Sequence, residues 1–294
     1  MNLEPTERRK FLALSGGGFA AGGLLGTGLI SAKEAAAQAP SDSLLRTVLE
    51  RGHLIVGTGS TNPPWHFEDE AGELQGLDIE MGKAIAFHQF DDESKVEFVR
   101  QDPAARVPNI LANKVDCVVQ FMTVNGQRAQ LVNFSRPYFL NSVSLLTLAD
   151  GRYKTYEELL EAGSEARASI LQNVDAMAIA RDALPEAEIM QVDTQANVIQ
   201  ALDAGHVDAA YMSVSQVKWL RVQRPDRYFD SGASFRPNYF SVALRQGDLD
   251  WLVYVDMALT NTMWGSHSQV FDAAYEKYLG LAPPDRKAGF PYFS

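Results

Sequence analysis

Residues 115–138 read VDCVVQFMTVNGQRAQLVNFSRPY, and this run carries the strongest structural signal in the 294-residue chain. It begins with a short apolar segment, Val115–Gln120, which stops at a polar turn, Thr123–Gly126. A second apolar segment, Leu131–Phe134, follows the turn. Apolar runs of this length bounded by turn residues are typical of strands covered on both faces in a parallel α/β sheet. The sequence therefore predicts an α/β fold with one strand on each side of this turn.

Two polar side chains lie just beyond the first of these strands. Ligands of parallel α/β sheets bind outside the carboxyl ends of the strands, so Thr123 and Arg128 stand where a ligand would lie. The guanidinium of Arg128 is a permanently charged fork that pairs with a carboxylate through two hydrogen bonds, and Thr123 adds a hydroxyl beside it. From spacing alone, the alternative is a solvated surface arginine.

The chain repeats this local pattern further along. Residues 110–119 read ILANKVDCVV, and residues 202–211 read LDAGHVDAAY. Each segment predicts a helix, a tight left-handed turn at Asn113 or Gly205, and a buried strand that opens with Val-Asp. Two such units indicate two lobes of similar α/β design.

The run MTVNGQRAQLVNFSRPYF resembles the segment MTITPERxxxVDFSxPY of the family 3 extracellular solute-binding proteins, the polar-amino-acid receptors of ABC importers. The runs YFSVALRQGD and FDAAYEKYLG also resemble this family, so the likeness spans nearly the whole mature chain. The resemblance implies a two-lobe periplasmic-binding-protein clamshell of type II with two hinge crossings. It also implies that Arg128 holds the α-carboxylate of the ligand and that Thr123 supports it.

The strand pattern divides the chain into four expected segments. Residues 1–39 are an export signal, and residues 40–143 form the first part of lobe 1. Residues 144–237 form lobe 2, and residues 238–294 return to complete lobe 1. The two crossings between the lobes would form the hinge on which the clamshell closes over its ligand.

The amino terminus has the layout of a twin-arginine export signal. Arg8 and Arg9 precede a Gly- and Ala-rich stretch that carries no charge until Lys33, and Ala37–Ala39 form an A-x-A cleavage pattern. The alternative is a membrane anchor, since the stretch is long enough to span a bilayer. Its many glycines oppose that alternative. We therefore expect removal of the signal, a periplasmic location and no membrane insertion afterwards.

The charge of the mature chain excludes several classes of partner. Residues 1–39 hold four basic and three acidic residues, so their removal takes the formal charge from −11 to −12. Such an acidic surface argues against nucleic acid and anionic membranes as partners. The single cysteine, Cys117, lies in an apolar run and is interpreted as a small buried hydrophobe. No metal, nucleotide or hydrolase motif occurs, so we expect no cofactor and no metal. One ligand per monomer is the default for a clamshell of this size, so we also expect a monomer.

The sequence departs from the family pattern where the resemblance implies acids for the ligand's α-ammonium. The loop GTGSTNPPW places Gly59 at the first acid and Asn62 at the aromatic that covers the ligand, and DAAYMS places Ser213 at the second acid. An ammonium without a carboxylate partner loses a hydrogen bond worth about 1.5–3 kcal/mol. We therefore expect a carboxylate-bearing ligand without an α-ammonium, such as an oxo, hydroxy or cyclic acid.

Other residues are candidates for the ligand site, and each also has an ordinary structural role as its alternative. Asp175, at a helix start in lobe 2, either replaces the missing acids or caps its helix. Gln120 stands at a strand end and matches a contact serine of the family. Trp65 and Phe121 are either aromatic platforms for the ligand or core residues. His66, beside Trp65, is expected to face solvent.

A receptor that delivers its solute to an ABC permease is the leading functional hypothesis. The second is an enzyme, because a few relatives of this fold are periplasmic dehydratases of cyclic carboxylic acids. That chemistry needs a placed general acid, for which the sequence offers Asp175, Asp102 and Glu68. The third is a protein-binding module without a small ligand, for which the missing acids are also evidence.

Overall fold

The computed structural model describes residues 42–172, 176–283 and 285–286. They lie in one compact unit, residues 39–294. The predicted export signal falls outside the described residues, as does Asp175. Within the described ranges, no helix has both the length and the apolar character needed to cross a membrane.

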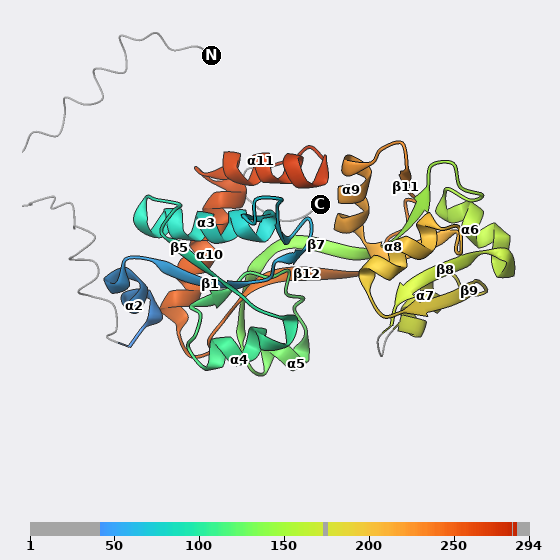
Figure 1. Ribbon diagram of the computed structural model, residues 1–294. Helices are drawn as coiled ribbons and strands as arrows, with labels where there is room; N and C mark the ends of the chain where they lie inside the picture. The colour runs from blue at the N-terminus through green and yellow to red at the C-terminus, as the bar shows by residue number, and fades with distance from the viewer. Residues whose placement is uncertain (1–41, 173–175, 284, 287–294) are drawn as a thin grey trace, which may run out of the picture. The chain divides into compact units, whose positions relative to one another are not determined.

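One mixed sheet organises this part of the chain (Figure 1). Its strands are β1 (Leu54–Thr58), β5 (Val96–Arg100), β6 (Cys117–Val118), β7 (Asn133–Leu148), β8 (Arg167–Leu171), β9 (Glu188–Val192), β10 (Ala209–Ser213), β11 (Tyr228–Asp230) and β12 (Phe235–Leu244). Their order is β5–β1–β6–β12–β7–β10–β8–β9, and β11 pairs with β7. The β1 strand is parallel to β5 and β6, and β8 is parallel to β9 and β10. The predicted α/β class is confirmed.

Helices follow most of the strands, and several of them begin at a residue whose side chain caps the helix. Their bounds are α2 (Leu44–Arg51), α3 (Leu77–Phe90), α4 (Arg106–Leu111), α5 (Gly126–Ala129), α6 (Tyr156–Ala162), α7 (Ala176–Ala183), α8 (Gln195–Asp203), α9 (Val214–Gln223), α10 (Leu249–Trp264) and α11 (Ser268–Leu279). Ser43 caps α2, and Thr155 forms a capping box at α6. A small antiparallel sheet consists of β2 (Thr61–Asn62), β3 (His66–Glu68) and β4 (Leu74–Gln75).

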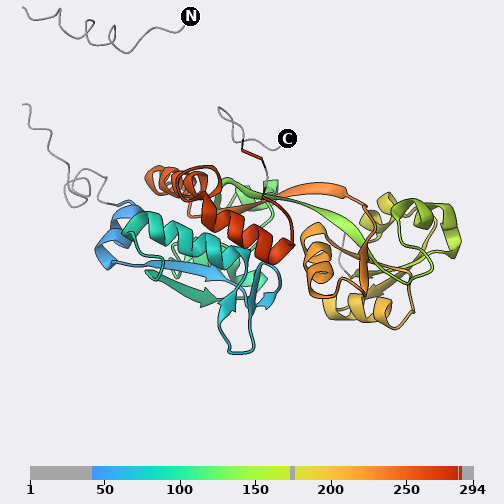
Figure 2. The ribbon, with the colours of Figure 1, turned by 90° about the horizontal axis from the view of Figure 1, so that it is seen from above.

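Separate hydrophobic cores lie at the two ends of the β7–β12 pair. On β7, Phe139 packs into a core with residues of β1, α3, α10 and α11, whereas Leu145 packs into another with residues of β8 and β10. In Figures 1 and 2, β7 and β12 run from one group of elements to the other. The described chain is thus a two-lobe fold with two strand crossings, as predicted. The boundaries expected after residues 143 and 237 fall inside these strands and stay predictions.

The crossing strands are paired irregularly. They are antiparallel from Phe235↔Val143 to Leu244↔Asn133, with register shifts between Phe235 and Asn238, between Phe240 and Ser241, and between Ser241 and Ala243. Arg236, next to the first shift, has a φ of 48°. Register shifts of this kind bend a strand and increase its local twist. The connection between the lobes is therefore a bent two-stranded ribbon.

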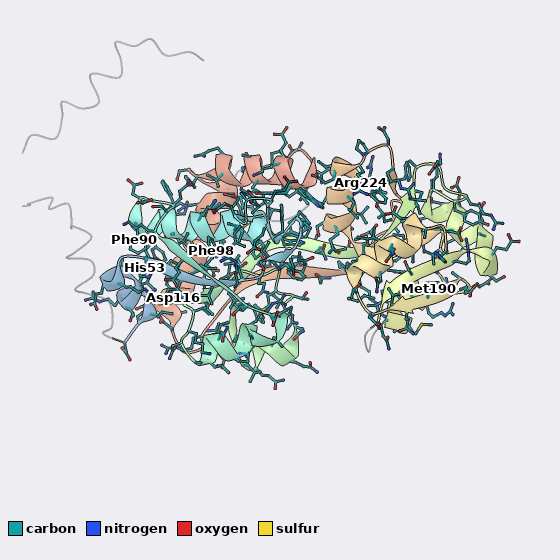
Figure 3. The ribbon with its side chains drawn as sticks, viewed as in Figure 1. His53, Phe90, Phe98, Asp116, Met190 and Arg224 are labelled. Atoms are coloured by element: carbon teal, nitrogen blue, oxygen red, sulfur yellow. The ribbon has the colours of Figure 1, made fainter. Side chains whose placement is uncertain are left out.

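The internal repeat predicted from sequence is present in three dimensions. Asn113 and Gly205 both adopt left-handed backbone conformations, with φ of 53° and 70°. Beyond each turn the aspartate of Val-Asp accepts a hydrogen bond from the neighbouring strand. Asp116 binds the amide of Ile55 at 2.7 Å, and Asp208 binds that of Arg167 at 3.0 Å. Figure 3 labels Asp116 beside the start of β1.

The structure around the turn at Thr123–Gly126, within residues 115–138, differs from the prediction. The side chain of Asn125 accepts a hydrogen bond from the amide of Arg128 at 2.9 Å and starts α5 there. Leu131, expected in a strand, is 51% exposed. The strand begins instead at Asn133 and continues without a break to Leu148. The expected strand at residues 115–120 is reduced to β6, because the residues after Val118 turn away to form the pocket wall.

Candidate functional site

A pocket of about 610 Å³ opens at the carboxyl ends of three parallel strands in lobe 1. It is lined by residues that follow β1, β5 and β6. Four residues predicted for the ligand site line it: Gly59, Asn62, Gln120 and Phe121. This is the end of a parallel sheet at which small molecules bind in α/β proteins. The pocket volume lies within the range of about 300–1,000 Å³ that small-molecule sites have.

One wall of the pocket is a network of side-chain amides. Gln101 donates to Gln120 Oε1 at 3.1 Å and accepts from Asn109 at 2.7 Å, while Gln120 Nε2 donates to the carbonyl of Gln101 at 3.1 Å. A Cβ at Gly57 would lie 2.6 Å from the Gln101 amide, so a side chain at this position would displace that amide. Because Gln120 is 1% exposed and bonded twice, it is held rigidly. Its contact with a ligand stays a prediction.

Arg128 lies on α5 and is half-buried. Its Nη1 donates to the carbonyl of Thr123 at 2.8 Å, and burial lowers its pKa. No described carboxylate forms an ion pair with this guanidinium. Thr123 itself is bridged to Phe240 of β12. Thr123 therefore orients the guanidinium through its backbone carbonyl, whereas the resemblance suggested support of the ligand through its hydroxyl.

The space beside Gly59 is filled by His66. A Cβ at position 59 would lie 2.5 Å from His66 Cδ2 and 3.0 Å from the amide nitrogen of Gln120. The expectation that His66 faces solvent is wrong, because it is 2% exposed. Its Nδ1 is bonded at 2.8 Å to Asp78, which is fully buried. The ring therefore cannot swing aside for an acid at position 59.

Asp78 lies behind the pocket and is bonded to two of the residues that line it, His66 and Phe121. Besides His66, it accepts hydrogen bonds from the amide of Phe121 at 2.8 Å and from the hydroxyl of Tyr138 at 2.6 Å. Phe121 has a φ of 33°, a conformation that a bulky residue rarely adopts without support. The bond from its amide to Asp78 supplies that support. Sequence reasoning overlooked Asp78 because its partners lie far from it along the chain.

The substitution Gly59→Asp tests whether an ammonium site can be restored. We expect it to lower the free energy of unfolding by about 1–3 kcal/mol, because the side chain overlaps fixed atoms of His66 and Gln120. It should not produce binding of L-amino acids. Chemical denaturation and calorimetric titration measure the two effects. The control is Gly126→Asp, where an added Cβ meets no atom within 4 Å. Tight amino-acid binding by the Gly59→Asp protein would contradict the expectation.

A second arginine beside the pocket was missed by the sequence analysis. Arg106 is 5% exposed, and its chain neighbours Ala105 and Asn109 line the pocket, although Arg106 itself does not. Its guanidinium carbon is 4.9 Å from the centroid of the Phe121 ring. Burial and the charge of Arg128 lower the pKa of Arg106 to about 10, against the opposing effects of Asp78 and Tyr138. Nothing local in the sequence signals this burial.

Trp65 is a core residue, although it was also predicted to bind ligand. It is 1% exposed, does not line the pocket, and packs edge-on against Phe139 and Phe240 at centroid distances of 4.7 and 5.0 Å. Its indole Nε1 donates to Ser215 Oγ at 3.0 Å. Because Ser215 belongs to α9, the indole connects lobe 1 with lobe 2.

Ser213 is a helix cap outside the pocket lining. Its hydroxyl accepts a hydrogen bond from the amide of Gln216 at 3.2 Å in a capping box at the start of α9. The side chain of Gln216 in turn donates to Asn62 Oδ1 at 3.0 Å. Ser213 is thus connected to the pocket residue Asn62 through Gln216. Its direct contact with a ligand stays a prediction.

The acidic residues considered as catalytic general acids do not provide a positioned general acid in this pocket. Glu68 is paired with Arg100 at 2.6 Å. Asp102 lines the pocket but is exposed to solvent. Asp175, the remaining candidate, lies outside the described residues. Pro103 also lines the pocket.

Comparison with known proteins agrees with this geometry. The model of the bacterial extracellular solute-binding proteins, family 3, matches residues 54–280. A glutamine-binding protein of Geobacillus stearothermophilus is 28% identical over 66% of this chain and 73% of its own. The L-cystine-binding protein TcyJ of Escherichia coli K12 is 25% identical over 81% of this chain and 87% of its own.

Solved structures show the same fold. An ancestral cationic amino acid solute-binding protein superposes with a TM-score of 0.70 at 26% identity, covering 81% of this chain and 100% of its own. A cysteine-binding protein of Campylobacter jejuni gives a TM-score of 0.62 at 25% identity, covering 81% and 93%. The type II periplasmic-binding-protein fold is confirmed. The relatives are named as binding proteins, which confirms the expectation of a binding protein over an enzyme.

Proposed function

Because the chain belongs to the bacterial extracellular solute-binding proteins, family 3, we propose that it is a receptor for a small carboxylate-bearing solute that lacks an α-ammonium. The receptor delivers this solute to the permease of an ABC importer. It works in the periplasm as a monomer after export by the twin-arginine route. The carboxylate of its ligand binds Arg128, which lies on α5 outside the lining of the lobe 1 pocket.

The carrying observation is the space beside Gly59. An acidic side chain at position 59 would be the partner of a ligand ammonium. A Cβ built at that position lies 2.5 Å from His66 Cδ2 and 3.0 Å from Gln120 Nε2, so these two residues occupy the space. The buried acid nearby, Asp78, already accepts bonds from three donors. Asp102 is solvated, so its charge is screened and its attraction for an ammonium is weak. These features favour an anion over a zwitterion.

A thermal-shift screen of 2-oxo and hydroxy acids against standard L-amino acids tests the proposal. A ligand present at 100 times its dissociation constant stabilises the folded protein by about 2.7 kcal/mol. We expect this stabilisation from one or more of the oxo or hydroxy acids. Stabilisation by L-amino acids alone would refute the absence of an ammonium. The variant Asp102→Asn is the control, because it weakens an amino acid held by that carboxylate and leaves an anion unaffected.

A further inference from the structure

We propose that the imidazole of His66 and the amide of Gln120 together bind a hydroxyl group of the ligand in the lobe 1 pocket, so that the solute is a hydroxy acid and not an oxo acid. This inference rests on the proposed function and specifies the substrate class of that receptor. It depends on three observations: the tautomer that Asp78 imposes on His66, the charges around this ring, and an unused N–H of Gln120 beside it.

Asp78 fixes which ring nitrogen of His66 carries the proton. The carboxylate of Asp78 accepts hydrogen bonds from the amide of Phe121 at 2.8 Å and from the hydroxyl of Tyr138 at 2.6 Å. His66 Nδ1 lies 2.8 Å from the carboxylate oxygen that binds the Phe121 amide, so it donates its proton there. In a neutral imidazole with the proton on Nδ1, the other nitrogen, Nε2, is a hydrogen-bond acceptor.

The charges around His66 favour the neutral ring. Asp78, which is fully buried, and Arg106, which is 5% exposed, act on each other electrostatically and carry opposite charges. Arg128 adds a second positive charge that acts on Arg106. A proton added to His66 would therefore leave an excess of positive charge among buried residues, which is strongly unfavourable. The ring thus presents a lone pair at Nε2.

This lone pair is available to a ligand. His66 lines the pocket, and its Nε2 forms no hydrogen bond within the described part of the chain but keeps access to the pocket. A Cβ built at Gly59 would lie 2.6 Å from His66 Nε2 and 3.0 Å from Gln120 Nε2. Since Gly59 and Gln120 also line the pocket, the two nitrogens border the same space.

Gln120 offers a donor beside this acceptor. Its Nε2 donates one N–H to the carbonyl of Gln101 at 3.1 Å, and a primary amide carries two. Its Oε1 accepts from Gln101 Nε2 at 3.1 Å, so the orientation of the amide is fixed. The second N–H has no acceptor among the residues that the structure describes. An acceptor and a donor therefore stand together in the pocket wall.

A hydroxyl matches this pair because it both donates and accepts. It donates its proton to His66 Nε2, and its oxygen accepts from Gln120. An oxo oxygen has no proton to donate, so it would face the lone pair of His66. An ammonium only donates, so it would face the N–H of Gln120. The wall thus favours a hydroxy acid over the oxo acid and the amino acid of the same skeleton.

Calorimetric titration of the wild-type protein with matched acids tests the proposal. One set is 2- and 3-hydroxybutanoate in both enantiomers, the corresponding oxo acids and butanoate. A cyclic pair is 1-hydroxycyclohexanecarboxylate and cyclohexanecarboxylate. We expect at least one hydroxy acid to bind about tenfold to a hundredfold more tightly than its counterparts without the hydroxyl, because those leave the acceptor or both groups unpaired.

The outcomes distinguish the inference from the proposed function. If no hydroxy acid exceeds its counterparts, the hydroxyl site is refuted, and the proposed function stands as long as the counterparts bind. If no acid of the panel binds, the proposed function fails and the inference fails with it.

The variant His66→Asn assigns the preference to this side chain. The amide nitrogen of asparagine can replace Nδ1 in the bond to Asp78, but the side chain has no atom at the place of Nε2. We expect loss of the preference for the hydroxy acid and an affinity for the acid without the hydroxyl within about threefold of the wild type. His66→Gln, whose amide oxygen replaces Nε2 as an acceptor, should keep part of the preference.

The matched control is His53→Asn, because His53 is paired with Glu97 and does not line the pocket. It should bind every acid as the wild type does. A folded His66→Asn protein that keeps the preference refutes the proposal. Should this variant not fold, the wild-type comparison decides alone.

The amino acid of the same skeleton separates the two levels of the inference. In 2-aminobutanoate an ammonium replaces the hydroxyl of 2-hydroxybutanoate. If the amino acid binds more tightly, the proposed absence of an ammonium is wrong, and so is the hydroxyl. If the oxo acid binds most tightly, the proposed function holds and the hydroxyl is wrong. If the hydroxy acid binds most tightly, both hold.

Discussion

Replacing Arg128 with methionine is expected to weaken binding of the carboxylate ligand by about a hundredfold or more. A guanidinium that grips a carboxylate with two charged hydrogen bonds contributes about 1.5–3 kcal/mol through each of them. Each 1.4 kcal/mol corresponds to about a tenfold change in affinity. Calorimetric titration of the ligand found by thermal shift measures this loss.

The charge on Arg128 and the geometry of its fork can be separated. Arg128→Lys keeps the charge but offers no planar fork, so we expect an affinity between those of the wild type and the methionine variant. Arg136→Met is the control for a simple change in net charge, because Arg136 is 54% exposed and forms only a long ion pair with Asp256 at 3.9 Å. If Arg128→Met binds as tightly as Arg136→Met, Arg128 does not hold the ligand and the proposed function fails.

The second large effect is expected on stability, from Trp65→Ala. Removing a fully buried indole leaves a cavity among Tyr138, Phe139 and Phe240, which should lower the free energy of unfolding by about 3–5 kcal/mol. Chemical denaturation followed by circular dichroism gives this value. The large expected loss follows from the position of Trp65 in the core of lobe 1.

Trp65→Phe is the matched control for this prediction. It keeps a ring in the core and removes the hydrogen bond to Ser215, whose net contribution is about 1 kcal/mol. We expect its loss of stability to be well below that of the alanine variant. A loss of less than about 1 kcal/mol for Trp65→Ala would show that the indole contributes little to the core.

Sequence reasoning succeeded where the determining interactions are local. The left-handed turns at Asn113 and Gly205 depend on residues that tolerate a positive φ, and each is followed by its Val-Asp step. Such signals lie within a few residues of the structure that they specify.

The extent of β7 could not be predicted in the same way. From sequence, Leu131–Phe134 is predicted as one strand and the apolar run Ser142–Leu148 as another. The structure joins them because β12 pairs with the intervening residues, for example at Phe240↔Phe139 and Tyr239↔Leu140. Pairing with a segment about a hundred residues away leaves no trace in the local alternation of apolar residues. The length of a strand is then decided by its partner.

Three residues in or near the pocket wall are buried for a shared physical reason. His66, Arg106 and Asp78 are buried because segments distant in sequence meet around Phe121. A histidine in a loop and an arginine at a helix start are usually exposed, so local reasoning assigns both to solvent. The sequence shows that Gly59 stands where the family pattern has an acid, but it does not show the structural reason. Only the structure shows that His66 occupies the space of the missing acid.

The irregular ribbon formed by β7 and β12 has a mechanical consequence. The two connections between the lobes, β7 and β12, are hydrogen-bonded to each other, so neither can move independently as a flexible linker would. Any rotation of one lobe must deform the hydrogen bonding between β7 and β12. The deformation concentrates at the register shift near Arg236 and Asn141. The paired strands therefore allow the lobes to bend relative to each other in one plane and resist sideways sliding of the lobes.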